Sequence, residues 1–208
     1  MHARAVPVET LRWRNDRLEL IDQRLLPQKV EYVTCVDAVE TAAAIRAMVV
    51  RGAPAIGCAA AFGVALEALR LGAMRGSSRD AALDRAFDAL RASRPTAVNL
   101  FWALARMQAA YAAVRDADGP AVAAALATEA EKIFGEDLET NRAMGRHGAE
   151  LVADGARIMT HCNAGALATA GHGTALGVVR SARDAGKRDR KSTRLNSSHS
   201  SVSRMPSS

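Results

Sequence analysis

The sequence predicts an α/β protein whose first part is mainly helical with a small antiparallel sheet, and whose later part begins a β–α unit. Three observations support this prediction. Residues 11–33 alternate in short apolar and polar groups, as in a hairpin, and apolar residues then recur at helical spacing from 37 to 153. The apolar run at 156–161 reads as a buried strand, and a glycine-rich loop and a helical pattern follow it.

The first elements have recognisable boundaries. Asn15 and Asp16 separate two apolar runs and predict the turn of the hairpin, and Pro27 closes that segment. Asp37 is expected to cap a helix that extends over 37–50, because its side chain can accept a hydrogen bond from a free amide of the first turn.

Glycine, proline and serine separate the next helices. Pro54 is expected at the first position of a helix that ends near Gly72, and Ser78 is expected to cap the following one. Arg94 precedes a proline and so avoids the helical region, which ends that helix, and Thr96 can cap the next. The helical patterns cover 54–69, 82–90, 100–114 and 121–153.

Residues 116–120, Asp-Ala-Asp-Gly-Pro, form the strongest break in the chain and predict a domain boundary. We expect a helical domain with a small sheet over 1–119, a second domain over 120–186 and a tail over 187–208. Eight of the last 22 residues are serine, and the tail carries net charge +5 of the overall +6. It lacks apolar periodicity, so we expect it to be disordered.

The bulk composition favours a soluble protein. An apolar fraction of 49% in 208 residues suffices for a core, and no secretory signal or long uncharged apolar run is present. The three cysteines, Cys35, Cys58 and Cys162, are far apart, which argues against a disulfide framework or a thiolate metal site and favours a reducing cytoplasm. Cys35 and Cys58 lie in apolar contexts and are expected in the core.

Two turns have features of an anion site. Arg51, Gly52 and Ala53 precede a helix whose Pro54 leaves amides free at the positive helix end, and arginine suits phosphate. Arg94 likewise lies in an extended segment just before a helix. Taken alone, each turn favours the interpretation of an ordinary helix start or loop with a surface arginine over that of a ligand site.

Cys162 follows the strand and precedes a predicted helix, where the helix dipole would favour its thiolate, although a lone cysteine is commonly inert. Asn163 could bind a hydroxyl group or cap the same helix. His161 and His172 lack a zinc pattern and are expected to be hydrogen-bonded structural residues. The glycines at 171, 173 and 177 do not have dinucleotide-fingerprint spacing and are expected to serve packing.

Together, RGAPAIG at 51–57, SRPTAVNL at 93–100 and THCNAGALAT at 160–169 resemble the methylthioribose-1-phosphate isomerase family of methionine salvage, over about residues 8–186. The IDQRLLP segment at 21–27 fits the same family. The wider family includes ribose-1,5-bisphosphate isomerases and non-catalytic regulatory subunits of a translation-initiation exchange factor, which remain alternative functions.

The resemblance implies that residue 120 begins a Rossmann-like catalytic domain and that the complete protein is a cytoplasmic homodimer. It implies that Arg51, Gly52, Ala53 and Arg94 bind the sugar phosphate and that Cys162 is catalytic. The implied reaction converts the aldose 5-methylthioribose 1-phosphate into its ketose with no metal or organic cofactor. The cysteine's partner in that family is an aspartate farther along the chain.

The resemblance stops at Gly186, in the middle of a domain. We therefore hypothesise that 187–208 is non-native sequence joined to a truncated gene, and we expect the fragment itself to be inactive. An alternative is nucleic-acid binding through the basic tail. No helix-turn-helix, zinc-finger or aromatic stacking pattern supports it, so we expect a small-molecule ligand, with neither nucleic acid nor membrane as partner.

Overall fold

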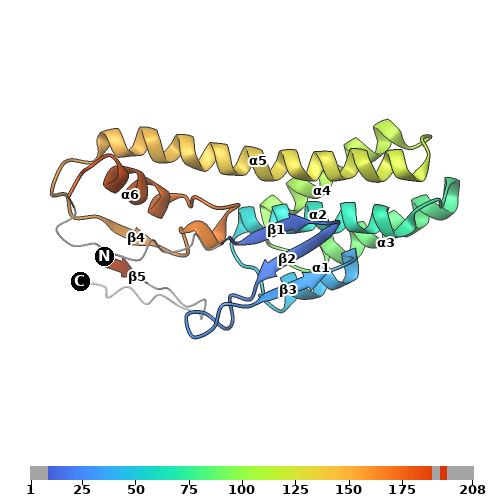
Figure 1. Cartoon of the computed structure of the whole chain (residues 1–208), viewed down its shortest axis with the longest axis horizontal. Helices are drawn as coiled ribbons and strands as arrows, with labels where there is room; N and C mark the ends of the chain where they lie inside the picture. Colours follow the sequence, from blue (N-terminus) through green and yellow to red (C-terminus); the bar gives the residue numbers. More distant parts are fainter. Residues whose placement is uncertain (1–8, 189–192, 196–208) are drawn as a thin grey trace, which may run out of the picture.

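The computed structural model describes residues 9–188 and 193–195 of the chain. Helices form most of it, and one long helix runs along the whole molecule (Figure 1). A small sheet and four shorter helices lie at one end of this helix, and a strand, a loop and a short helix lie at the other. The segments 1–8, 189–192 and 196–208, and with them most of the predicted tail, lie outside the described residues.

The predicted hairpin is confirmed. Strands β1 (Leu11–Arg14) and β2 (Arg17–Ile21) pair antiparallel, and β3 (Tyr32–Cys35) joins the other edge of β2. Asn15 and Asp16 form the turn with φ of 50° and 55°, the left-handed conformation that a tight hairpin turn requires. In β2, Leu18 and Leu20 point into the core, as strand alternation dictates.

Four helices follow the sheet: α1 (Ala38–Arg46), α2 (Ala53–Leu71), α3 (Gly76–Arg91) and α4 (Val98–Val114). Asp37 caps α1 as predicted, because its carboxylate accepts a 2.7 Å hydrogen bond from the amide of Glu40. The helix ends earlier than expected, since Val49 and Val50 turn inward and are buried.

Three predicted details of the helix starts were wrong. Ser78 lies inside α3, which begins at Gly76, and the first positions of α2 are Ala53 and then Pro54. Thr96 does not cap α4, whose N-cap position is Ala97 and which has no side-chain cap. In each case tertiary packing shifts the first turn by one or more residues, and local capping preferences are too weak to prevent this.

Helix α2 is the centre of the fold. Fifteen of its 19 residues are buried, and it packs against α1, α3, α4, the long helix and the sheet. Among the described residues it alone is long and apolar enough to cross a membrane, but 83% of its most apolar window is buried inside the protein. Its many alanines and glycines allow neighbours to approach closely on all sides, so α2 is a core helix.

The long helix α5 (Gly119–Leu151) joins the two parts of the structure. Asp118 caps it through a 2.8 Å bond from the amide of Ala121. Its first half contributes Val122, Leu126 and Ile133 to the core around α2, and its second half packs against α6 (Ala175–Asp184). The domain boundary near residue 119 thus coincides with a helix start and stays a prediction.

After α5 come β4 (Met159–His161), the short 3₁₀ turn η1 (Ala166–Ala168) and α6. A strand followed by a loop and helix was predicted, but the expectation of a buried strand was wrong, since Met159 is 72% exposed and His161 is exposed. The side chains of a strand alternate between its faces, and only Thr160 points inward. Within the described residues, β4 pairs only with β5 (Thr193–Leu195), in parallel.

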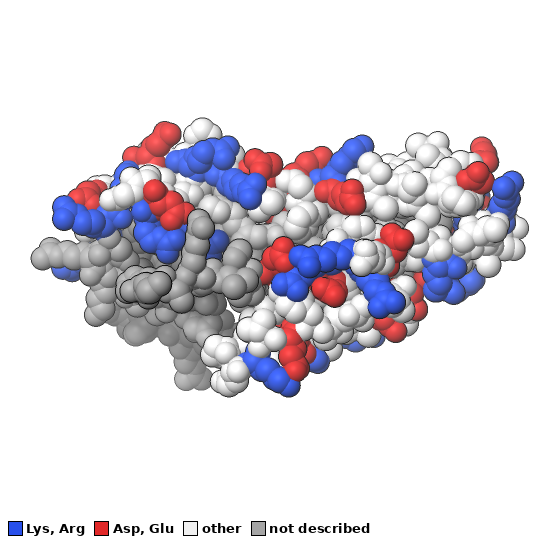
Figure 2. Space-filling view, in the orientation of Figure 1, with Lys and Arg blue, Asp and Glu red and all other residues white. Residues whose placement is uncertain are grey.

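Charges of both signs are interleaved over the described residues of the face shown in Figure 2. Many form ion pairs, such as Arg106 of α4 with Glu129 and Glu136 of α5. One cation differs from the rest, because Arg79 of α3 is only 2% exposed. Its guanidinium donates to the carbonyl oxygens of Arg115 and Ala117, the latter at 3.1 Å, at the end of α4.

We predict that Arg79→Ala lowers the free energy of unfolding by about 2–4 kcal/mol, because it removes a buried side chain whose charged hydrogen bonds join α3 to the end of α4. Arg91→Ala is the matched control, since Arg91 pairs with Asp88 at the surface, and it should cost less than about 1 kcal/mol. Urea unfolding measures both. Equal losses of unfolding free energy in the two variants would show that the buried guanidinium of Arg79 stabilises the protein no more than a surface ion pair does.

Candidate functional site

The three sequence motifs meet at the first turn of α2. A Cβ added to Gly52 would lie 2.4 Å from both the Cα and the carbonyl oxygen of Ala168, in the loop after β4. A Cβ on Gly57 would lie 2.8 Å from the carbonyl oxygen of Asn99, in the first turn of α4. These distances are shorter than any real side chain tolerates, so both segments touch the backbone of α2 directly.

The start of α2 retains the anion-binding character that the sequence predicts. Gly52 occupies the N-cap position with φ of 97°, and no side chain caps the helix. The amide of Ile56 bonds to the carbonyl of Gly52, whereas the amide of Ala53 lies before the first intrahelical bond. Arg51 and Ala53 are exposed. The positive end of this helix is therefore open to a ligand.

Arg94 lies where the second motif enters α4. It is half-buried and extended, and its carbonyl accepts a 3.1 Å bond from the amide of Ala97. The neighbouring Ser93 is buried and donates to the carbonyl of Leu90 at 2.6 Å, which anchors the turn to the end of α3. Because Asn99 touches Gly57, two helix starts without side-chain caps lie side by side here.

Cys162 differs from the other two cysteines, as predicted. It is exposed and adopts φ of 67°, a left-handed conformation that few side chains other than glycine adopt. Cys35 and Cys58 are buried, and burial raises the pKa of the Cys35 thiol to about 11. Burial and the nearby Asp137 also raise the pKa of Cys58. Of the three thiols, Cys162 alone is accessible to a ligand.

The predicted setting of Cys162 was wrong in one respect. No α-helix starts directly after it, because the chain first makes the 3₁₀ turn and α6 begins only at Ala175. The helix dipole therefore does not act on this thiol. For the same reason Asn163 caps no helix, since the N-cap positions are Gly165 and Thr174.

The loop between β4 and α6 is held by side chains from distant parts of the chain. Thr10 donates to the carbonyl of Ala166 at 2.8 Å, and the amide of Gln23 donates to the carbonyl of Leu167 at 2.7 Å. Asp137 of α5 accepts from the amide of Ala170 at 2.7 Å. Irregular backbone needs such partners when it is buried.

Sequence reasoning did not identify these three anchors. For Asp137 a signal was available, because it follows Ala130 and Ile133 at helical spacing on the buried stripe of α5, and Asn141 continues that stripe. A carboxylate on an apolar stripe indicates a specific partner. Thr10 and Gln23 carry no comparable local signal, since they flank an ordinary hairpin.

The carboxyl group of Asp137 borders a cavity of about 370 Å³ between the first turns of α2 and α4 and the middle of α5. Removal from water raises its pKa, and the bond from Ala170 opposes this effect. The cavity walls are mainly apolar, and they include Pro54, Cys58 and Trp102. The cavity therefore lies beside the point where the motifs meet.

His172 and Gly177 serve structure, whereas the hydrogen-bonded structural role expected of His161 is not confirmed. His172 is half-buried and shares a 2.9 Å hydrogen bond with Ser181, as predicted for a structural histidine. Burial, together with Arg180, lowers its pKa. Gly177 packs on the His172 ring, where a Cβ would lie 2.9 Å from Cδ2, so the packing role of this glycine is confirmed. His161 is exposed, and no cluster of three metal-ligating side chains occurs within the described ranges.

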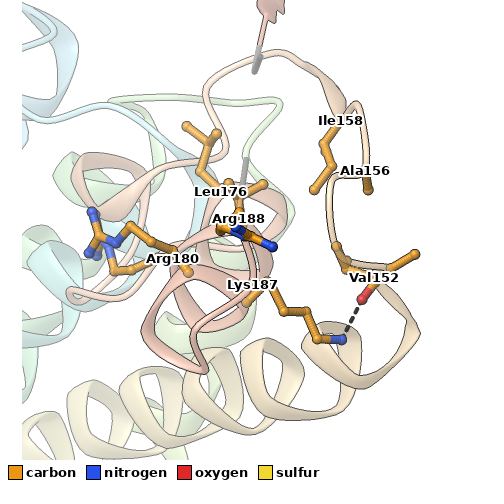
Figure 3. A pocket seen from close by; sticks show the side chains of 11 residues that line it. Val152, Ala156, Ile158, Leu176, Arg180, Lys187 and Arg188 are labelled. Carbon is orange, nitrogen blue, oxygen red and sulfur yellow. Dashed lines mark hydrogen bonds between the residues drawn. The ribbon is translucent and has the colours of Figure 1, made fainter. Parts of the chain in front are cut away.

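A second cavity of about 380 Å³ lies at the far end of α5 (Figure 3). Val152, Ile158 and Leu176 give it an apolar wall, and Arg180 and Lys187 lie at it. The ammonium group of Lys187 donates to the carbonyl of Val152, at the end of α5. The walls of this cavity come from the end of α5, from α6 and from the segment before β4.

The chain has clear relatives. The model of the Initiation factor 2 subunit family matches residues 49–191. The methylthioribose-1-phosphate isomerase of Albidiferax ferrireducens is 61% identical over 184 residues, which are 87% of this chain and 51% of that protein. The enzyme of the same name from Desulforudis audaxviator is 54% identical over 182 residues, 88% of this chain and 52% of that protein.

Two solved structures share the fold. The 5-methylthioribose 1-phosphate isomerase from Pyrococcus horikoshii superposes with a TM-score of 0.82 at 40% identity, covering 88% of this chain and 51% of that one. The translation initiation factor eIF-2B, subunit delta, from A. fulgidus gives 0.79 at 43% identity, covering 90% and 54%. The chain thus spans about half the length of the relatives that it matches.

We predict that Gly52→Ala destabilises the protein beyond the cost of its positive φ. Gly155→Ala is the matched control, since Gly155 also has positive φ (70°) but no atom within 4 Å of an added Cβ, and we expect it to cost about 1–2 kcal/mol. The collision with Ala168 should add about 1–3 kcal/mol at Gly52. Urea unfolding of both variants checks this, and equal losses would contradict the close backbone contact.

The half-buried Asp137 and the buried Asp22 should give stability changes of opposite sign with pH. Burial raises the pKa of Asp137 above its value in the unfolded chain. Its contribution to stability is therefore present below the unfolded pKa and is lost as pH rises through the folded pKa. The guanidinium of Arg24 lowers the pKa of Asp22, whose contribution is present above its unfolded pKa and is lost as pH falls through its folded pKa.

At neutral pH, Asp137→Asn should therefore raise the melting temperature and Asp22→Asn should lower it. Both differences should shrink as pH falls below about 4, where both carboxyls are protonated in the unfolded chain. Thermal melts of the three proteins from about pH 3 to about pH 8 measure this. Differences of the same sign would contradict the assigned pKa shifts.

Proposed function

Because the chain belongs to the Initiation factor 2 subunit family, we propose that it carries one part of the active site of an aldose–ketose isomerase. The proposed reaction converts 5-methylthioribose 1-phosphate into 5-methylthioribulose 1-phosphate, a step of methionine salvage. The observation that carries the proposal is the meeting of three motifs at the first turn of α2. Relatives at 54–61% identity are named for this substrate.

The phosphate group of the substrate would bind at the start of α2. Arg51 supplies a planar cation, and Gly52 allows the ligand to approach the backbone. The amide of Ala53 lies at the positive end of the helix, before the first intrahelical hydrogen bond. Arg94 would contact the substrate from the neighbouring turn. The dianionic phosphate thus meets two arginines and a helix start, each of which favours negative charge.

The chemical step needs an acid and a base. Phosphate on C1 prevents ordinary opening of the sugar to a free aldehyde, so the site must open the ring with the phosphate in place and then move hydrogen between C1 and C2. Cys162, the exposed thiol, would be one member of the pair. The resemblance assigns the second member to an aspartate in the part of the relatives that this chain does not match.

The same proposal extends to the fold. The order β4, loop and α6 would be the first β–α unit of a Rossmann-like domain that starts near residue 120, and the complete protein would be a cytoplasmic homodimer. The apolar cavity at α6 and the exposed Met159 fit a sheet that continues in the relatives. The 208-residue chain alone should therefore be inactive and prone to aggregate.

A second candidate is a non-catalytic regulatory subunit that binds a sugar phosphate or nucleotide without turnover. The observation in its favour is the similarity to the eIF-2B delta subunit structure, with a TM-score of 0.79. Ribose 1,5-bisphosphate is an alternative substrate. The accessible Cys162 favours a catalytic protein over the regulatory one, since a pure binding site has no need of a free thiol.

The test is a chimera that joins residues 1–186 to the remaining part of the Albidiferax ferrireducens relative. We expect it to isomerise 5-methylthioribose 1-phosphate in preference to ribose 1,5-bisphosphate. Cys162→Ala should lower kcat by about 10²-fold or more, and Arg51→Ala and Arg94→Ala should mainly raise KM.

Cys35→Ala is the control for the first of these variants, because it removes a buried thiol, and its turnover should equal that of the unchanged chimera. Unchanged turnover in Cys162→Ala would refute the catalytic assignment. A chimera that binds the sugar phosphate but never isomerises it would favour the regulatory subunit instead.

A further inference from the structure

Asp137 makes a contact that packing of α5 does not require. Its Oδ2 accepts a 2.7 Å hydrogen bond from the amide of Ala170, which is 33 residues away in the sequence. Ala170 is only 5% exposed, so water cannot readily replace this partner. Without the carboxylate, a buried amide would be left without an acceptor.

This bond fixes more than one residue, because the loop around Ala170 is tightly bonded within itself. The hydroxyl of Thr169 accepts from the amides of Gly171 and Gly173, at 3.2 and 3.1 Å. The carbonyl of Ala164 accepts from the amides of Thr174 and Leu176. These hydrogen bonds tie residues 164–176 to one another, and the segment begins two residues after Cys162.

The hydrogen bond that Asp137 accepts also differs from those of the other two side chains that hold the loop. Thr10 and Gln23 are neutral donors to loop carbonyls, whereas Asp137 is a carboxylate, and hydrogen bonds to charged groups are the stronger ones. The side chain of Asn141 donates to the backbone carbonyl of Asp137. A carboxylate in this half-buried, mainly apolar place is costly, as its raised pKa indicates. Within the described part of the chain, the one hydrogen-bond partner of its carboxylate outside α5 is the amide of Ala170 in the loop.

We propose that Asp137 is a positioning residue for Cys162. Its carboxylate holds the loop of residues 164–176 against α5. Ala168 of this loop lies against Gly52, so the bond fixes the loop that directly follows Cys162 beside the start of α2, where the substrate phosphate would bind. The effect on turnover rests on the proposed function. The effect on the loop does not, because it follows from the hydrogen bonds alone.

Loop order can be measured on the 208-residue chain by hydrogen exchange of the amides in 164–176. Asp137→Ala should raise their exchange rates by about tenfold or more, since one bond to a charged group is lost. Asp137→Asn keeps an acceptor oxygen and should stay within about threefold of the unchanged chain. Asp80→Ala is the matched control, because it removes a carboxylate that bonds Tyr111 and Arg115 elsewhere in the helical bundle.

The chimera gives the functional readout. Asp137→Ala should lower kcat by about 10–100-fold and change KM by less than about threefold, because a displaced thiol impairs the chemical step and leaves the phosphate site intact. Asp137→Asn should restore most of kcat. An equal loss of kcat in both variants would overturn the proposal, since it would mean that the proton or charge of Asp137 acts directly.

The proposal would also be overturned if Asp137→Ala and Asp80→Ala raised exchange in 164–176 equally, since the effect would then be general destabilisation. A failure of the proposed function has a different signature. In that case the unchanged chimera shows no turnover, while the exchange rates on the 208-residue chain still decide whether Asp137 holds the loop.

Discussion

The contact between the backbones of Gly52 and Ala168 is the constraint on which the site depends. It brings a loop from the later part of the chain within van der Waals reach of the start of α2, at a distance that leaves no room for a Cβ. Since α2 is also the most enclosed helix of the core, the position of this contact is set by the packing of the whole first part. Any substrate that binds at the helix start therefore also meets the loop that carries Cys162.

The loop is irregular, and this explains why three distant side chains are needed to hold it. In a helix or a sheet the backbone groups satisfy one another, but here the carbonyls of Ala166 and Leu167 and the amide of Ala170 take hydrogen-bond partners from other elements. The partners come from both sides of the hairpin and from the middle of α5. The small sheet and the long helix thus act as supports of the loop, in addition to their contributions to the core.

The three cysteines illustrate how location decides chemistry. Cys35 and Cys58 have the same thiol as Cys162, yet burial raises their pKa and removes them from any ligand. Cys162 stays exposed because the chain leaves β4 in a left-handed conformation instead of entering a helix. Of the three, Cys162 is therefore the thiol that a ligand can reach.

The sequence by itself determined the order of the elements, the hairpin turn at Asn15 and Asp16, the cap at Asp37 and the distinct character of Cys162. These features arise from local periodicity, turn chemistry and capping, which act over a few residues. Only the tertiary structure decided that three motifs share one helix turn, and that Asp137 and Gln23 hold the loop. It also decided that Met159 and His161 of β4 are exposed and that no α-helix starts directly after Cys162. The hydrogen bonds of Asp137 and Gln23 to the loop join residues that are 33 and 144 positions apart in the sequence. No local pattern encodes contacts over such separations.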